Sequence, residues 1–269
     1  MLYHAQNGTI KLENGEIDYV CYGTGNKIMI MLPGLGDALR NIKGTALPFA
    51  LAYHKHSADY KVYMFSRKYP IEEGYSIRDM ARDQVNAMKA LGISRADIMG
   101  VSQGGMIAQY LAIDHPELVR KLVLVVTTSR LGETQRATIR HWISLAEEEN
   151  YAEIMLDTTY KSYSESYIKK HKYLIPLLGK IGKPKDFSRF LIQANACLNH
   201  DSTEELHKIT CPTFVIGGNC DQIVGPNSSS ELAAHIRGSR LQIYEGLGHA
   251  TYEEAKDFFP KVLDFLENT

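Results

Sequence analysis

Short and almost wholly apolar segments recur along the chain, separated by longer segments with a helical period. The apolar segments cover residues 28–32, 62–65, 96–101, 122–126, 213–217 and 241–244. Continuous apolar runs of strand length are typical of parallel strands that are covered on both faces. Ahead of them, residues 9–12 and 17–20 flank the Asn14-Gly15 pair, which predicts an antiparallel hairpin.

The segments between these strands predict helices. One begins after Ser76, with Asp79 three residues later as in a capping box, and its apolar residues recur at helical spacing. A second helix is expected over 103–114 and a third over 258–266. Strands that alternate with helices indicate an α/β fold with a parallel, doubly wound sheet.

Residues 130–208 interrupt this alternation. They have a helical pattern throughout and no apolar run of strand length, and they carry charged runs such as Glu147-Glu148-Glu149. We therefore expect a core domain made of residues 1–129 and 209–269, with a helical cap inserted over 130–208.

Composition excludes several classes of partner. The 269 residues are 44% hydrophobic and 23% charged, with a net charge of −1, so we expect neither a nucleic acid nor an anionic membrane surface as partner. The longest aliphatic runs have five residues, far fewer than the roughly 20 that span a bilayer. The N-terminus lacks the pattern of a signal peptide, and the four cysteines are widely spaced. These features predict reduced thiols and a cytoplasmic protein.

The segment Gly100-Val101-Ser102-Gln103-Gly104 fits the pattern G-x-S-x-G. A predicted strand precedes it and a predicted helix follows it, and in that context the serine lies on a tight strand-to-helix turn. The alternative is a serine that only caps the helix after a glycine turn. The context favours Ser102 as a nucleophile.

A serine nucleophile needs a base, and the base needs an acid. His249 follows the strand at 241–244 and precedes the last helix, and Asp221 follows the strand at 213–217. Both therefore lie at the C-terminal edge of the predicted sheet, where sites in open α/β folds are found. The alternatives are a surface histidine and a turn aspartate.

These motifs together resemble the α/β-hydrolase superfamily, in particular its esterase-like branch with a helical cap. Residues 32–36 (Leu-Pro-Gly-Leu-Gly) are similar to the family's oxyanion loop, 221–226 to its acid loop and 248–249 to its histidine loop. The resemblance implies eight mostly parallel strands and the chain order serine, aspartate, histidine. It also implies that the backbone N–H groups of Leu35 and Gln103 stabilise the oxyanion.

The chain departs from the family pattern at two places. The oxyanion loop begins with Pro33 where the family often has histidine, and residues 65–69 replace the usual Asp-x-Arg-Gly. Some relatives carry the acid one strand earlier, but residues 127–129 (Thr-Thr-Ser) hold no carboxylate there, which favours Asp221.

No cofactor is expected. The chain has no G-x-G-x-x-G after a strand and no phosphate-binding loop with its lysine. His54 and His56 resemble half of a metal site, but no carboxylate or cysteine set accompanies them, so we expect no metal.

The expected reaction is acyl transfer from a small-molecule ester to water, with a small or medium acyl group. The same residues could also serve a thioesterase, a lactonase, a carbon–carbon bond hydrolase or a perhydrolase, an acyl transfer to another acceptor, or a receptor with slow or single turnover.

The aromatic residues of the insertion are candidates for substrate contact. They include Trp142, Tyr160 and Tyr163, and the spacing of Tyr160, Tyr163 and Tyr167 predicts one shared helix face. The alternative is that they only pack the insertion onto the core. Because all the candidate catalytic groups lie outside 130–208, we expect the insertion to set substrate choice and not catalytic competence.

Overall fold

The structure is a computed structural model that describes residues 2–54 and 59–268. Within these ranges, eight strands form one sheet in the order β1-β2-β4-β3-β5-β6-β7-β8. The strands are β1 (Gln6–Leu12), β2 (Gly15–Tyr22), β3 (Lys27–Leu32), β4 (Tyr60–Phe65), β5 (Ala96–Val101), β6 (Val119–Val125), β7 (Thr213–Gly218) and β8 (Arg240–Tyr244). Only the pairs that involve β2 are antiparallel, and every pair from β4 to β8 is parallel. The predicted sheet is confirmed.

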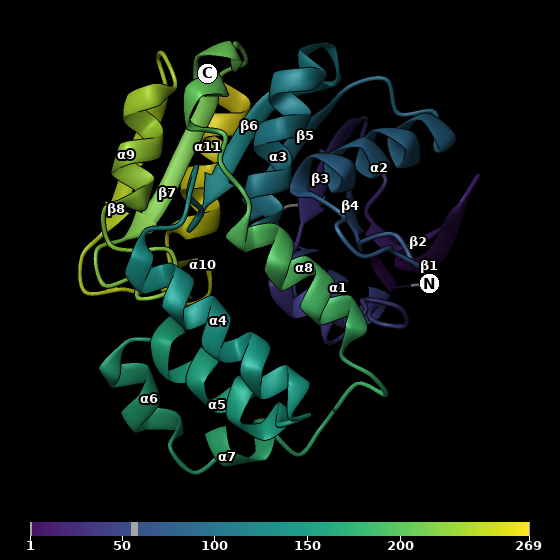
Figure 1. Cartoon of the computed structure of the whole chain (residues 1–269). Coiled ribbons are helices and arrows are strands. Elements are labelled where there is room, and N and C mark those ends of the chain that lie inside the picture. The colour runs from purple at the N-terminus through teal and green to yellow at the C-terminus, as the bar shows by residue number, and fades with distance from the viewer. Residues whose placement is uncertain (1, 55–58, 269) are drawn as a thin grey trace.

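Helices cover both faces of the sheet (Figure 1). One face is packed by α1 (Ala46–Tyr53) and α11 (Phe258–Asn268), and the other by α2 (Ile77–Ala90), α3 (Gln103–Asp114) and α9 (Ser228–His235). Along β6 the side chains alternate between the layers: Leu124 packs in the α2/α3 layer, whereas Val125 packs in the α1/α11 layer. Each such fully buried side chain stabilises the fold by roughly 1.5–3 kcal/mol.

The predicted helix signals are present in the structure. The Ser76 hydroxyl accepts the N–H of Asp79 at 3.1 Å, and the Asp79 carboxylate accepts the N–H of Ser76 at 3.0 Å, which completes the capping box of α2. Gly92, just past the end of this helix, has φ +68°, a conformation that favours glycine. Shorter helical turns are η1 (Leu2–His4), η2 (Leu35–Ala38), η4 (Pro116–Leu118), η5 (Thr203–Lys208) and α10 (Thr251–Glu254).

A group of helices lies between β6 and β7 in the chain. They are α4 (Glu133–Glu147), α5 (Tyr151–Ser162), α6 (Glu165–His171), α7 (Ile175–Leu178) and α8 (Ser188–Leu198). Figure 1 shows α4 to α7 grouped beyond one end of the sheet, while α8 leads back toward the core. An isolated bridge between Arg130 and Asp201 brings the two ends of this segment together. In the part of the chain that the structure describes, no helix is both long and apolar enough to cross a membrane.

His200 is buried where this segment rejoins the core. Its ring lies edge-on to that of Tyr110 in α3, with 5.3 Å between the ring centroids. Burial lowers the pKa of His200 to about 4, and the nearby Asp201 carboxylate opposes that effect only in part. The folded protein therefore holds this imidazole neutral.

The free energy of unfolding should fall as the pH is lowered from 6.5 toward 4, because the unfolded chain then protonates His200 and the folded protein does not. Between pH 7 and pH 5 this one group should account for about 2 kcal/mol. Urea unfolding of the wild type and of His200→Phe at both pH values measures it. An equal loss in both proteins would contradict the prediction.

Candidate active site

Ser102 lies on a sharp turn between β5 and α3. Its backbone has φ 54° and ψ −120°, a region that a residue other than glycine adopts only at a cost of order 1–3 kcal/mol. Two bonds to β6 and the segment after it hold the turn: the Ser102 N–H donates to the Val125 carbonyl at 2.9 Å, and the Thr127 hydroxyl donates to the Ser102 carbonyl at 2.8 Å. Thr127 belongs to the segment where some relatives carry the acid.

Close backbone contacts around this turn require glycine. A Cβ at Gly104 would lie 2.0 Å from the carbonyl oxygen of Leu32 at the end of β3, and a Cβ at Gly100 would lie 2.4 Å from the carbonyl oxygen of Gly104. The first turn of α3 is thereby pressed against the start of the oxyanion loop.

His249 and Asp221 form a buried pair. The Nδ1 atom of His249 lies 2.8 Å from Oδ2 of Asp221, and the other oxygen, Oδ1, accepts the N–H groups of Ile223 and Val224 at 2.8 and 3.0 Å. This contact fits a tautomer in which the Nδ1–H group of His249 donates to the Asp221 carboxylate. The Nε2 atom of His249 is then left as a proton acceptor.

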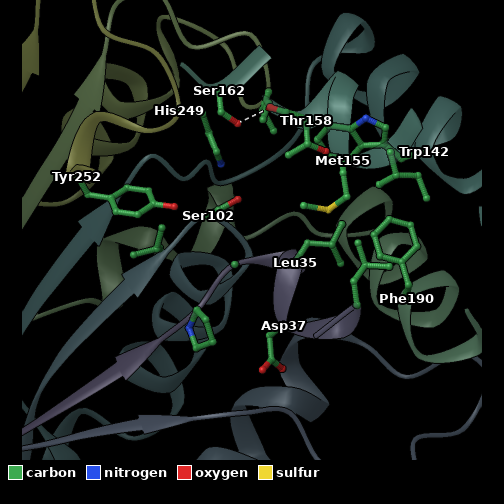
Figure 2. Close-up of a pocket in the computed structure, with 17 residues that line it drawn as sticks. Leu35, Asp37, Ser102, Trp142, Met155, Thr158, Ser162, Phe190, His249 and Tyr252 are labelled. Atoms are coloured by element: carbon green, nitrogen blue, oxygen red, sulfur yellow. Dashed lines mark hydrogen bonds between the residues drawn. The ribbon is translucent and has the colours of Figure 1, made fainter. Parts of the chain in front are cut away.

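Ser102 and His249 line the same cavity, and Figure 2 shows their side chains pointing toward each other. The cavity has a volume of about 340 Å³. Apart from those two residues, its walls are mostly apolar and come from the oxyanion loop, α4, α5 and α8; they include Leu35, Leu39, Trp142, Ile154, Met155 and Phe190. Of the three predicted catalytic residues, Ser102 and His249 line this apolar cavity, and Asp221 is joined to it through its contact with His249.

The two predicted oxyanion donors belong to residues that begin helical turns. Gln103 is the first residue of α3 and Leu35 is the first of η2, and the N–H of a first helical residue has no acceptor within its own helix. The two loops are close: a Cβ at Gly34 would lie 3.2 Å from the Cβ of Ser102. The arrangement can offer two N–H groups to a negative charge that develops at Ser102.

Arg67 supports the predicted oxyanion loop through hydrogen bonds. Its guanidinium donates to the carbonyl of Pro33 and, at 3.3 Å, to the side-chain oxygen of Gln103. Arg67 is only 1% exposed, and this burial lowers its pKa to about 10, so it remains a cation at neutral pH. The unusual segment 65–69 therefore supports the loop that begins with Pro33.

Asp37, in η2, anchors the other end of the same loop. Its buried carboxylate accepts the hydroxyl of Ser66 at 2.7 Å and pairs with the guanidinium of Arg189 in α8 at 2.7 Å. Arg189 also donates to the backbone carbonyl of Asp37 at 2.5 Å. Because Arg189 lies in the chain between β6 and β7, the structure adds a link between that segment and the loop after β3 that the motifs did not indicate.

The segment between β6 and β7 also contacts the loop that carries His249. The N–H of Ala250, next to His249, donates to the carbonyl of Ser162 at the end of α5 at 2.9 Å. The Ser164 N–H donates to the Glu254 carboxylate at 3.0 Å. Both loops that flank Ser102 thus take part of their support from residues between β6 and β7.

The three aromatic residues proposed as substrate contacts lie in different places. Trp142 lines the cavity, and its indole N–H donates to Asp157 at 2.7 Å. Tyr160 is 52% exposed, and Tyr163 donates to Glu253 at 2.5 Å; neither is among the residues that line the cavity. The expected shared helix face is wrong, because α5 ends at Ser162 and α6 begins at Glu165.

A second apolar cavity adjoins the first. It has a volume of about 200 Å³ and shares with the first cavity Pro33, Gly34, Val101 and Tyr252. Methionines from three neighbouring strands form much of its wall: Met31, Met64 and Met99. The four shared residues therefore have an apolar cavity on either side of them, close to Ser102.

Metal ligands do not gather at this site. Across residues 2–54 and 59–268, no group of three histidine, cysteine, aspartate or glutamate side chains could hold a metal ion. His56, one member of the histidine pair noted in the sequence, lies outside the described residues.

Comparisons with known proteins agree with this architecture. A family model for the alpha/beta hydrolase fold matches residues 27–145. A pimeloyl-[acyl-carrier protein] methyl ester esterase of Neisseria meningitidis is 29% identical over 184 residues, which are 64% of this chain and 70% of that enzyme. A 2-hydroxy-6-oxononadienedioate/2-hydroxy-6-oxononatrienedioate hydrolase of a Pseudomonas species is 25% identical over 272 residues, covering 94% of this chain and 92% of that enzyme.

Among solved structures, MGS-M2, an alpha/beta hydrolase enzyme from a deep-sea metagenome library, superposes with a TM-score of 0.84. The match covers 97% of this chain and 98% of that one, at 21% identity, and bears on the fold alone. The family match over residues 27–145, the sheet order and the strand-to-helix turn agree, and the chain is similar to proteins of the α/β-hydrolase fold.

Proposed function

We propose that the protein hydrolyses carboxylic esters through an acyl-enzyme intermediate on Ser102, with His249 as base and Asp221 as its partner. One observation carries the proposal: the buried Asp221–His249 pair, with 2.8 Å between Oδ2 and Nδ1, faces the same apolar cavity as a serine on a strained turn. A serine, a base and an orienting acid are the elements that activate a hydroxyl for acyl transfer.

In the first step the Oγ atom of Ser102 attacks the ester carbonyl carbon while its proton passes to Nε2 of His249. The Asp221 carboxylate stabilises the imidazolium that forms. The carbonyl oxygen becomes an oxyanion and accepts the N–H groups of Leu35 and Gln103. The C–O bond to the alcohol then breaks, and the alcohol leaves with the proton from His249.

In the second step, water replaces the alcohol. His249 removes a proton from the water, the resulting hydroxide attacks the acyl carbon, and the same two N–H groups stabilise the second oxyanion. Collapse releases the carboxylic acid and returns the proton to Ser102, so each cycle consumes one ester and one water.

The walls of the two cavities support an uncharged ester of small or medium size as substrate. A cavity of about 340 Å³ lies at the lower end of the range for small-molecule sites. The adjoining 200 Å³ gives apolar space for a group on the other side of the ester bond. The similarity to a methyl ester esterase supports an ester as the bond that is cleaved.

Labelling tests the nucleophile. A fluorophosphonate probe should modify the wild type and leave Ser102→Ala unmodified, because only a serine with an activating base reacts at a useful rate. Each wild-type protein molecule should hydrolyse many molecules of a p-nitrophenyl ester. This hydrolysis should be absent in Ser102→Ala. Labelling that persists in Ser102→Ala would refute the assignment, and a single turnover would favour a receptor.

Truncating a cavity wall tests substrate choice. Met155→Ala should shift the ratio of kcat/KM between short-chain and longer acyl esters by roughly 1–3 kcal/mol, because it removes one apolar contact. Tyr160→Ala is the matched control, since Tyr160 lies in the same helix and is exposed. A change that is equal for all esters, or that also occurs in Tyr160→Ala, would argue against α5 as a determinant of specificity.

Loss of the Arg189–Asp37 pair tests whether the insertion also supports catalysis. Arg189→Met should lower kcat for every ester by a similar factor of about 10 to 100, somewhat less than the loss of a complete oxyanion donor. Arg140→Met is the control, because that arginine pairs with Glu133 on the exposed side of α4. Unchanged kcat in a folded Arg189→Met protein would restore the simpler view that the insertion only selects substrates.

A further inference from the structure

The outermost part of the insertion exposes a cluster of large apolar side chains. This surface, which we call the tip surface, consists of residues 169–185, from the end of α6 through α7 to the loop before α8. Tyr173 is 80% exposed and Ile181 is 65% exposed. The other large exposed apolar residues of the cluster are Leu174, Leu177 and Leu178. Figure 1 places α6 and α7 at the end of the molecule farthest from α2 and α3.

The same segment is strongly basic. It contains no aspartate or glutamate and six exposed lysines: Lys169, Lys170, Lys172, Lys180, Lys183 and Lys185. Among the described residues, Lys183 is the one member of this set that forms an ion pair, with Glu149 at 3.4 Å. Arg40 adds a further cation at the base of the surface, where it donates to the Leu178 carbonyl at 3.4 Å. A net positive charge is thus concentrated here although the whole chain carries −1.

The packing of α7 against α5 keeps the apolar side chains of the tip surface exposed. Ile175 is 2% exposed and fills the inner side of α7. A Cβ at Gly179 would lie 2.6 Å from the Cα of Ala152 in α5, and the Tyr151 hydroxyl donates to the Ile181 carbonyl at 3.0 Å. With the inner side fixed in this way, the leucines of α7 remain on the outer side.

The chemistry of this surface fits a lipid bilayer better than a protein partner. The cores of protein interfaces are depleted of lysine and enriched in arginine, whereas every cationic residue between 169 and 185, apart from a histidine, is lysine. At a bilayer, lysine side chains extend to the headgroups while neighbouring apolar side chains enter the boundary between headgroups and acyl chains. Each lysine near an anionic surface adds about 1 kcal/mol of attraction.

We propose that the tip surface docks the protein peripherally on bilayers that contain anionic lipids. The lysines are attracted to the anionic headgroups of the bilayer, and the exposed apolar side chains of residues 173–181 insert at the level of these headgroups. The net charge of −1 predicts no membrane partner, but net charge averages over the whole surface and does not show a local concentration of charge. This inference is independent of the proposed esterase activity.

Co-sedimentation of the full-length protein with vesicles tests the proposal. The protein should bind vesicles of phosphatidylcholine with 30% phosphatidylglycerol, and the binding should be lost in about 0.5 M salt because charges are then screened. A triple variant, Lys169→Gln, Lys170→Gln and Lys172→Gln, should partition at least about tenfold more weakly. The pair Leu174→Ser and Ile181→Ser should lower binding similarly while leaving the salt dependence in place.

The matched control removes three exposed lysines elsewhere, Lys11→Gln, Lys27→Gln and Lys89→Gln, and should bind as the wild type does. An equal loss in this control would overturn the proposal, because any positive charge would then serve. Absence of binding to the anionic vesicles would overturn it as well. So would equal binding to pure phosphatidylcholine, or binding to a soluble acidic protein without binding to vesicles.

Discussion

The contact between the first turn of α3 and the end of β3 is the constraint on which the site depends. Gly104 lies so close to the Leu32 carbonyl that no side chain fits between them. That contact holds Ser102 at positive φ and brings its hydroxyl to the edge of the sheet beside the oxyanion loop. The cost of the strained backbone is offset by bonds from Val125 and Thr127 and by the packing of α3 against the sheet.

The loop after β3, next to this turn, is held by charges that are buried together. Arg67 bonds to the Pro33 carbonyl, while Asp37 bonds to Ser66 and to Arg189. A buried carboxylate is costly unless it is paired and hydrogen-bonded, so these groups constrain one another. The loop that would bind the oxyanion therefore has a defined position before any substrate arrives, which is the condition for electrostatic stabilisation without reorganisation.

The helices between β6 and β7 have three different surroundings, each on a different side of the helical group. Their inner side forms the apolar walls of the cavity, and their contacts with the core include Arg189 and the Ser162 carbonyl. Their outer end carries the lysines and exposed leucines of the tip surface.

The sequence by itself determined the elements that depend on local pattern. The apolar runs, the Ser76 capping box and the glycines around Ser102 are local signals, because strand burial, helix caps and tight turns are decided within a few residues. Asp221 and His249 could be predicted to lie near each other because the ends of parallel strands converge on one sheet edge, and the structure places them 2.8 Å apart. The tertiary structure decided which side chains of the insertion face the cavity, separating Trp142 from Tyr160 and Tyr163. It also decided that Arg189 reaches Asp37, 152 residues away, and that six lysines share one surface with exposed leucines. Such contacts depend on how helices rotate and pack against one another, and a local pattern of polar and apolar residues does not encode that.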